Sequence, residues 1–279
     1  MSELIEEIQT RAAEQLEFTG APDRERELAR CKRFLKDEGA RLKKLHRCGG
    51  LGREVCEARA VVIDALIVQL FKAAMNRAPM GKSKKPPAIT VVALGGYGRA
   101  ELNPHSDIDI QFLCSDRLLG GAQPHEFLQS VTDAVLYPLW DVGLKIGHSV
   151  RRVRDCVEEA NQDMQSKTAL IESRRVAGDE ALFEGMVTTV QAKCVKPLVE
   201  KYIAARLEDQ TARRTKHGNA VTMQEPNIKN GCGGLRDYQN LRWMMHFKLG
   251  YSSVEDLEKQ KVVSKAEAER LEAAYSFLL

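Results

Sequence analysis

Residues 89–113 decide the fold of this chain. They read Ile89-Thr90-Val91-Val92-Ala93-Leu94, then Gly95-Gly96-Tyr97-Gly98 and, after a short connection, Asp107-Ile108-Asp109-Ile110-Gln111-Phe112-Leu113. In the last segment polar and apolar residues alternate at first, which predicts a β-strand. Because successive side chains of a strand point to opposite faces, Asp107 and Asp109 share one face, with Cα atoms about 6.6 Å apart. Ile108, Ile110 and Phe112 take the other face and can anchor the strand on a core.

The glycine turn and the aspartate pair together predict chemistry on phosphates. Gly95 and Gly96 lack Cβ atoms, so backbone N–H groups there can approach a phosphate closely. Carboxylates on one strand face can bind a divalent metal, and Mg²⁺ prefers such oxygen ligands, with Mn²⁺ as the substitute. An isolated Asp-x-Asp strand has another interpretation, a solvated edge or a salt-bridge site. The nearby glycine turn favours a metal-dependent phosphoryl-transfer site.

A two-metal site also needs a third carboxylate, which another strand of the same sheet would supply. The candidates are Glu172, Asp141, Asp155 and Glu158. We favour Glu172, because residues 170–174 can form a strand that delivers it beside the pair.

Length and composition exclude several classes of protein. The chain has 279 residues, is 43% hydrophobic, and carries 42 basic and 39 acidic residues for a net charge of +3. Because basic and acidic residues are balanced, the chain lacks the excess of basic residues that is typical of a dedicated nucleic-acid binder. The longest apolar stretch, Val61 to Phe71, is interrupted by Asp64 and Gln69 and is shorter than the roughly 20 residues of a membrane span. We therefore expect no nucleic-acid partner and no membrane segment.

The cysteines and the N-terminus favour a cytoplasmic protein. The seven cysteines are scattered without a Cys-x-x-Cys pair, so their spacing predicts neither a disulfide framework nor a zinc site. The acidic start, residues 1–7, has none of the features of a secretion signal.

Apolar periodicity predicts an α/β (α+β) fold, a small mixed sheet with helices before and after it. We divide the chain into a helical region 1–75, a core 76–180 and a helical region 181–279. Amphipathic helices are expected within 2–45, and a buried helix at 53–76. The other expected elements are a loop at 76–87, strands at 89–94, 107–114 and 145–150, a turn at Gly120-Gly121, helices at 124–140 and 153–162, and a segment at 168–177 that is ambiguous between helix and strand.

Four ordered blocks resemble one enzyme family. Residues 95–109 resemble the signature of polymerase-β-type nucleotidyltransferases. Together with 139–151, 168–174 and 225–237, they are similar to the N-terminal catalytic domain of the bifunctional uridylyltransferase/uridylyl-removing enzymes, which modify the PII nitrogen-signalling protein. A weaker likeness reaches back to His46, Gly49 and the helix containing Asp64.

The resemblance implies a polymerase-β-like core and assigns roles to individual residues. Gly95 and Gly96 would bind the triphosphate of UTP, and Asp107, Asp109 and Glu172 would hold the metals and act in catalysis. UMP would pass to a tyrosine of PII, and pyrophosphate would leave. Arg99 would neutralise triphosphate charge, unless it is a surface arginine that pairs with Glu101. Ser106 would contact the nucleotide, or simply turn the chain before the strand.

A second glycine turn, Gly233-Gly234, leads into a helix expected at 237–249. The helix N-terminus and the nearby Lys229 and Arg236 favour an anion, so phosphate contacts are predicted there. Helix capping and a packing turn are the alternative. Cys232 stands where the family often has proline.

Two other functions stay open. The motif does not specify the base or the acceptor, so another nucleotidyltransferase is possible, as is a catalytically silent regulatory domain of the same fold. Members of the resembled family continue into a hydrolase domain that removes UMP and into glutamine-sensing domains. Residues 273–279 end within an expected helix, so we expect a fragment of such a protein.

Overall fold

The computed structural model describes residues 2–18, 20, 23–79, 86–120, 125–220, 222, 224–251 and 253–279. The chain forms two compact units, residues 1–50 with 54–190 and residues 51–53 with 191–279, and each is described by itself. Two predicted features, the loop at 76–87 and the turn at Gly120-Gly121, lie partly outside the described residues.

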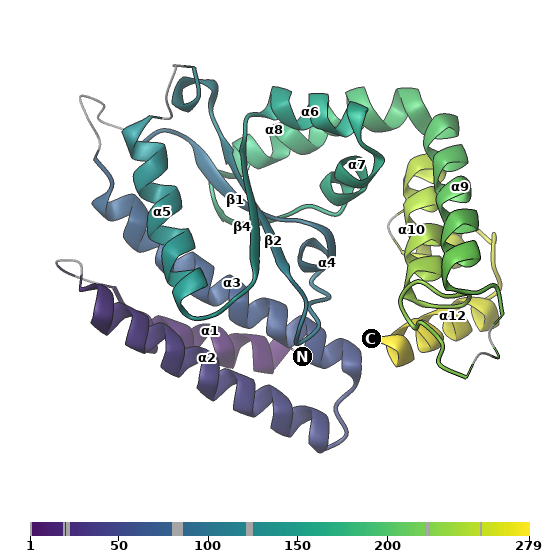
Figure 1. The fold of residues 1–279 in the computed structure, drawn as a ribbon, viewed down its shortest axis with the longest axis horizontal. Coiled ribbons are helices and arrows are strands. Elements are labelled where there is room, and N and C mark those ends of the chain that lie inside the picture. The colour runs from purple at the N-terminus through teal and green to yellow at the C-terminus, as the bar shows by residue number, and fades with distance from the viewer. Residues whose placement is uncertain are drawn as a thin grey trace. The chain divides into compact units, whose positions relative to one another are not determined.

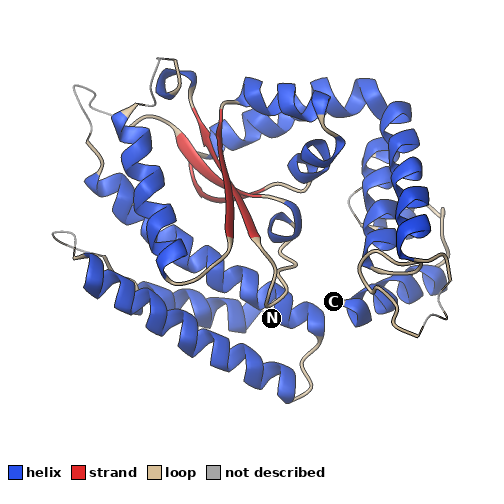
Figure 2. Ribbon diagram, in the orientation of Figure 1, coloured by secondary structure: helices blue, strands red, loops and turns tan. Residues whose placement is uncertain are grey.

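A four-stranded mixed sheet forms the centre of the first unit (Figure 2). Its strands are β1 (Ile89–Ala93), β2 (Ile108–Cys114), β3 (Ile146–Arg151) and β4 (Arg174–Gly178). Their order is β3-β2-β1-β4, with β2 and β3 parallel and the other two pairs antiparallel. The mixed sheet and the first three strands are confirmed, each strand to within one residue of its predicted bounds.

Helices cover both faces of this sheet (Figure 1). Ile108, Ile110 and Phe112 belong to the same buried core as residues of α3 (Gly52–Arg77) and α5 (Glu126–Asp141), as the alternation in the strand predicted. On the other face, Gln111 contacts Cys156 of α6 and Met186 of α8. The helices of the first unit are α1 (Ser2–Gln15), α2 (Arg24–Arg47), most of α3 (Gly52–Arg77), α4 (Gly95–Gly98), α5 (Glu126–Asp141), α6 (Val153–Gln162), α7 (Met164–Ile171) and α8 (Glu180–Val190), with a 3₁₀ turn at Asp116–Leu118.

The ambiguous segment at 168–177 contains both structures. Helix α7 runs to Ile171, Glu172 caps its C-terminus, and strand β4 begins at Arg174. The strand expected at 170–174 is therefore wrong, because Asp163 caps α7 through the amide of Ser166 and the helix continues over the apolar residues. Strand β4 pairs with β1 and not with β2, so it does not place Glu172 in a strand beside the aspartate pair.

The second unit is helical, as predicted for the residues after 180. It contains a π-helical turn (Gln191–Val195), a 3₁₀ turn (Lys196–Leu198), α9 (Val199–His217), α10 (Leu235–Leu249), α11 (Val254–Lys259) and α12 (Lys265–Leu278). Two stacked aromatic pairs hold these helices together, Tyr202 on Phe247 and Tyr238 on Tyr275. Among the described residues of the whole chain, none of the helices has the length and apolar character needed to cross a membrane.

Candidate functional site

Two unpaired carboxylates lie at the start of β2. Asp107 immediately precedes the strand, Asp109 is its second residue, and both side chains are exposed. Neither carboxylate forms an ion pair or a hydrogen bond within the described part of the chain. Partial desolvation, and then the negative charge of Asp107, raise the pKa of Asp109. Two carboxylates that repel each other with no cation between them suit a divalent metal ion.

Gly147 makes room for the Asp109 carboxylate. In the parallel pairing of β2 and β3, Gly147 lies opposite Asp109. A Cβ atom built on Gly147 would lie 2.4 Å from Oδ1 of Asp109, so the carboxylate occupies the space that a side chain would fill. This residue is not among those predicted from the sequence. A glycine inside a predicted strand was the available signal, because it often marks the close approach of another group.

The first glycine turn lies beside the aspartates and presents unused amides. The N–H of Leu94 donates to the carbonyl of Asp109 at 2.9 Å, and α4 begins at the next residue, Gly95. Gly95 has φ +56°, in the left-handed region that favours glycine. The amides of Gly95, Gly96 and Tyr97 donate to no acceptor among the described residues, as is usual in the first turn of a helix. Free N–H donors and unpaired carboxylates thus lie side by side.

Arg99 follows this turn and binds two carboxylates. Its Nε donates to Glu101 and its Nη1 to Glu172, both at 2.6 Å. The three side chains are only 9 to 11% exposed. A Cβ atom on Gly98 would lie 2.2 Å from the carbonyl oxygen of Glu172, so the turn also packs tightly on the end of α7. The predicted contact of Arg99 with Glu101 is confirmed, but Arg99 is not a surface residue.

The arrangement fits a metal ion at the aspartate pair alone. Among the described residues, no group of three or more His, Cys, Asp or Glu side chains could hold a metal. Glu172 is bound to Arg99, Asp141 pairs with Arg24, and Asp155 pairs with Arg152. A metal-binding role for Glu172 stays a prediction.

A second network, of hydrogen bonds around Tyr97, holds the first glycine turn in place. The buried Tyr97 donates its hydroxyl to Asp64 of α3 at 2.6 Å. Arg174 of β4 donates to both carboxylate oxygens of Asp64, at 2.7 and 3.1 Å, and to the carbonyl of Tyr97 at 3.2 Å. Burial, and then the charge of Asp64, hold the pKa of Tyr97 well above its usual value, so its proton stays in place. The sequence analysis gave these residues no role, because their contact depends on packing.

The remaining predicted residues lie elsewhere. Ser106 is exposed, and its amide donates to the carbonyl of Asn103, so it does turn the chain before β2. Lys229 and Arg236 belong to the second unit, where the amide of Arg236 donates to the carbonyl of Lys229 and the guanidinium lies 5.1 Å from the ring of Trp243.

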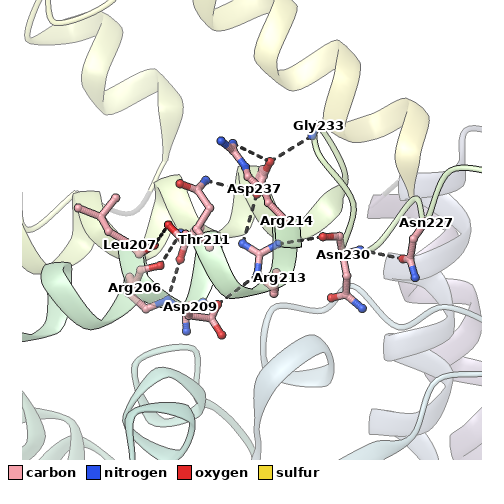
Figure 3. Close-up of polar contacts among 12 residues, drawn as sticks. Arg206, Leu207, Asp209, Thr211, Arg213, Arg214, Asn227, Asn230, Gly233 and Asp237 are labelled. Atoms are coloured by element: carbon pink, nitrogen blue, oxygen red, sulfur yellow. Dashed lines mark hydrogen bonds and ion pairs between the residues drawn. The ribbon is translucent and has the colours of Figure 1, made fainter. Parts of the chain in front are cut away.

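The anion at the start of α10 comes from the chain itself. Asp237, in the first turn, accepts the N–H of Gly233 at 3.1 Å and pairs with Arg213 and Arg214, each at 3.2 Å (Figure 3). Desolvation opposes ionisation, but these hydrogen bonds and one from Gln210 prevail and lower the pKa of Asp237. The second glycine turn therefore already holds a carboxylate.

Packing requires a glycine within this second turn and another just before it. A Cβ atom on Gly231 would lie 2.7 Å from the carbonyl oxygen of Asn227, and one on Gly234 would lie 2.6 Å from that of Ile228. The capping and packing interpretation accounts for Gly234 in the turn and for Gly231 just before it.

Comparison with known proteins identifies relatives over most of the chain. Curated proteins named bifunctional uridylyltransferase/uridylyl-removing enzyme match it, among them those of three organisms. The one from Pseudomonas putida is 36% identical over 90% of this chain and 26% of its own length, and the one from Rhodopseudomonas palustris is 35% identical over 81% and 24%. The one from Azospirillum brasilense is 32% identical over 99% and 29%. This chain is a homologue of those enzymes. It spans about a quarter of their length.

Two family models match different parts of this uridylyltransferase homologue. The model of GlnD PII-uridylyltransferase matches residues 201–279 in the second unit. The model of glutamate-ammonia ligase adenylyltransferase matches residues 2–133, which include the glycine turn and the aspartate pair. The segment that carries the candidate site thus resembles proteins named for transfer of two different nucleotides.

Proposed function

We propose that this chain is a Mg²⁺-dependent nucleotidyltransferase that moves UMP from UTP to a tyrosine hydroxyl of the PII protein and releases pyrophosphate. One observation carries the proposal: Asp107 and Asp109, unpaired in the part of the chain that the structure describes, lie beside a turn whose amides have no acceptor there. Carboxylates hold metal ions and free amides hold phosphate oxygens, and nucleotidyl transfer needs both.

Each residue of the site has a part in this proposal. The amides of Gly95, Gly96 and Tyr97 would bind oxygens of the triphosphate and orient it. Asp107 and Asp109 would hold Mg²⁺, which when bound neutralises charge on the phosphates and polarises the attacked phosphorus. Asp64 and Arg174 would hold Tyr97, and through it the turn, in position. The described residues thus bind, orient and neutralise, the usual contribution of protein groups to phosphoryl transfer.

We propose a role for Arg99 that differs from the predicted neutralisation of the triphosphate. Because Glu101 and Glu172 already neutralise it, contact with a triphosphate would require Arg99 to leave at least one of these partners. We propose that it mainly holds the end of α7 against the glycine turn. Glu172 would become a metal ligand only after release from Arg99.

The choice of UMP over AMP rests on the relatives. The uridylyltransferase relatives cover 81 to 99% of the chain, whereas the adenylyltransferase family model matches residues 2–133 only. Transfer of AMP is the second candidate, and a catalytically silent domain is the third. A cytoplasmic location and the absence of a nucleic-acid partner stay predictions.

A nucleotide panel tests these alternatives. The full chain is incubated with Mg²⁺ and UTP, ATP, CTP or GTP, with and without purified PII, and nucleotide incorporation into PII is measured by mass spectrometry. We expect UMP incorporation that Asp107→Asn abolishes, while Asp37→Asn on α2, the same change outside the site, has no effect. AMP incorporation would establish the second candidate. Mg²⁺-dependent UTP binding without transfer to PII would establish the third.

A further inference from the structure

A cationic pocket is lined by residues of α2, of α3 and of the connection from α5 to β3, all in the first unit. It has a volume of about 280 Å³, close to the lower end of about 300 Å³ for small-molecule sites. Lys32 and Lys36 of α2 and Arg59 of α3 line it, and none of its described lining residues is acidic. Nothing in the proposed transfer reaction uses this pocket.

Arg59 is the most informative residue of the pocket. It is half-buried, and its Nε–H is buried without a hydrogen-bond partner in the described part of the chain. Desolvation lowers its pKa, and the effect that opposes this comes from the thiol of Cys56 and not from a carboxylate. A desolvated guanidinium without a counter-ion is costly, whereas most half-buried arginines here, such as Arg11, Arg77 and Arg99, have one.

The other walls of the pocket are mainly apolar. Leu35 and Leu42 of α2, Ile63 of α3, and Val142 and Leu144 of the α5–β3 connection contribute them. Apolar walls favour a ligand with a hydrocarbon part, and the planar guanidinium favours a carboxylate, which it can bind with two parallel hydrogen bonds.

We propose that this pocket binds a small organic carboxylate, with its acid group on Arg59 and its apolar body against α2 and α3. Lys32 and Lys36, which line the pocket and are exposed, strengthen the attraction but do not replace Arg59. The site lies on the same helix as Asp64, which directly follows Ile63. Binding here does not depend on the proposed transfer activity.

Thermal unfolding and calorimetric titration of the full chain test the proposal, with sodium valerate as the probe and chloride added to keep the ionic strength constant. Valerate should raise the Tm in a saturable way, because it binds only the folded protein. Valeramide, which has the same shape without charge, should leave the Tm unchanged. Inorganic phosphate, which has charge without an apolar body, should give a much smaller shift. An equal shift from valerate and valeramide, or from valerate and phosphate, would overturn the proposal.

Amino-acid substitutions test whether valerate binds in this pocket. Arg59→Gln should weaken valerate binding by about tenfold or more, the loss expected for a charge-assisted hydrogen bond, whereas the control Arg33→Gln on the exposed side of α2 should bind as the parent does. Arg59→Gln should unfold at the same temperature as the parent or higher without ligand, because it removes an unpaired charge. Lys32→Gln should weaken binding a few-fold relative to Lys43→Gln, a matched change on α2 outside the pocket. Unchanged binding by Arg59→Gln, or by Lys32→Gln if the first variant does not fold, would rule out this site.

Discussion

The two glycine turns of this protein look alike in sequence and differ in what they leave free. Gly95-Gly96 and Gly233-Gly234 each lead into a helix, and both were predicted to bind phosphate. At the first turn, amides have no acceptor and the neighbouring carboxylates have no cationic partner among the residues that the structure describes. At the second, the carboxylate of Asp237 already accepts the N–H of Gly233 and pairs with two arginines. A glycine turn is available to an external anion only when the chain does not supply one itself.

The largest effect on nucleotidyl transfer should follow from changing the carboxylates beside the first turn. Asp109→Asn should lower nucleotidyl transfer by about 10²–10³-fold or more, the scale of losing a principal electrostatic group. Its folding stability should not fall, because the raised pKa of Asp109 shows that the ionised form is disfavoured in the native state. Transfer rates and Tm of the variant and of Asp37→Asn measure both effects. If the Asp109→Asn variant kept its activity, the first turn would not differ from the second in its importance for transfer.

The same raised pKa predicts a pH dependence of stability. A carboxyl group whose pKa is higher in the folded state destabilises the protein above that pKa and loses this effect as the pH falls below its unfolded value. The parent should therefore lose stability relative to Asp109→Asn as the pH rises through the acidic range, and the difference should become constant near neutral pH. Urea unfolding at a series of pH values measures it. If the difference in stability between the parent and Asp109→Asn were the same at every pH, the raised pKa of Asp109 would be contradicted.

The next largest effect should come from Gly147→Ala. Its Cβ atom would lie 2.4 Å from Oδ1 of Asp109, and because that atom ends a side chain, the carboxylate can rotate away. We expect transfer to fall about 10-fold to 100-fold with a higher requirement for Mg²⁺, since misplacement by about 1 Å can cost that much. The free energy of unfolding should change by less than about 1.5 kcal/mol. Gly185→Ala, whose Cβ would meet nothing within 4 Å, is the control.

A smaller effect is expected from Tyr97→Phe. Loss of its hydrogen bond to Asp64 should destabilise the chain by about 1–2 kcal/mol. The KM for UTP should rise several-fold, while kcat at saturating UTP should stay nearly constant, because the variant loosens the turn without removing its amides. Hydrogen exchange of residues 94–101 should become faster in the variant. An unchanged KM together with faster exchange would show that the amides do not bind the triphosphate.

The smallest effect on activity is expected at the second turn. Asp237→Asn should leave the KM for UTP within about twofold of the parent, because Asp237 and not a nucleotide occupies the turn, yet it should cost about 1–3 kcal/mol of stability through unpaired arginines. The lowered pKa means that the ionised Asp237 stabilises the fold above its unfolded pKa, and this contribution is lost as the pH falls through its folded value. Acid unfolding of parent and variant should therefore converge at low pH. A rise in KM for Lys229→Gln would instead support the predicted phosphate contact at this turn.

Local patterns predicted much of this fold. Alternation identified β2, and a helix apolar on all sides identified α3, because both signals repeat within a few residues. The segment around Glu172 could not be decided in the same way, since a short apolar run fits a helix or a strand, and a capping residue, Asp163, made the first part helical. Gly147 was missed because its importance depends on its register with Asp109 in a neighbouring strand.

The sequence by itself determined that Asp107 and Asp109 would lie on one face of a strand and that glycines would follow the preceding strand. Those features depend on backbone geometry within a few residues. Only the tertiary structure decided which charges meet. It brought Arg99 to Glu172, Arg174 to Asp64, and two arginines to Asp237, and it left Asp107, Asp109 and Arg59 without partners in the described residues. The reason is physical: ion pairs form between groups that packing brings within about 4 Å, and their positions along the chain do not fix that distance.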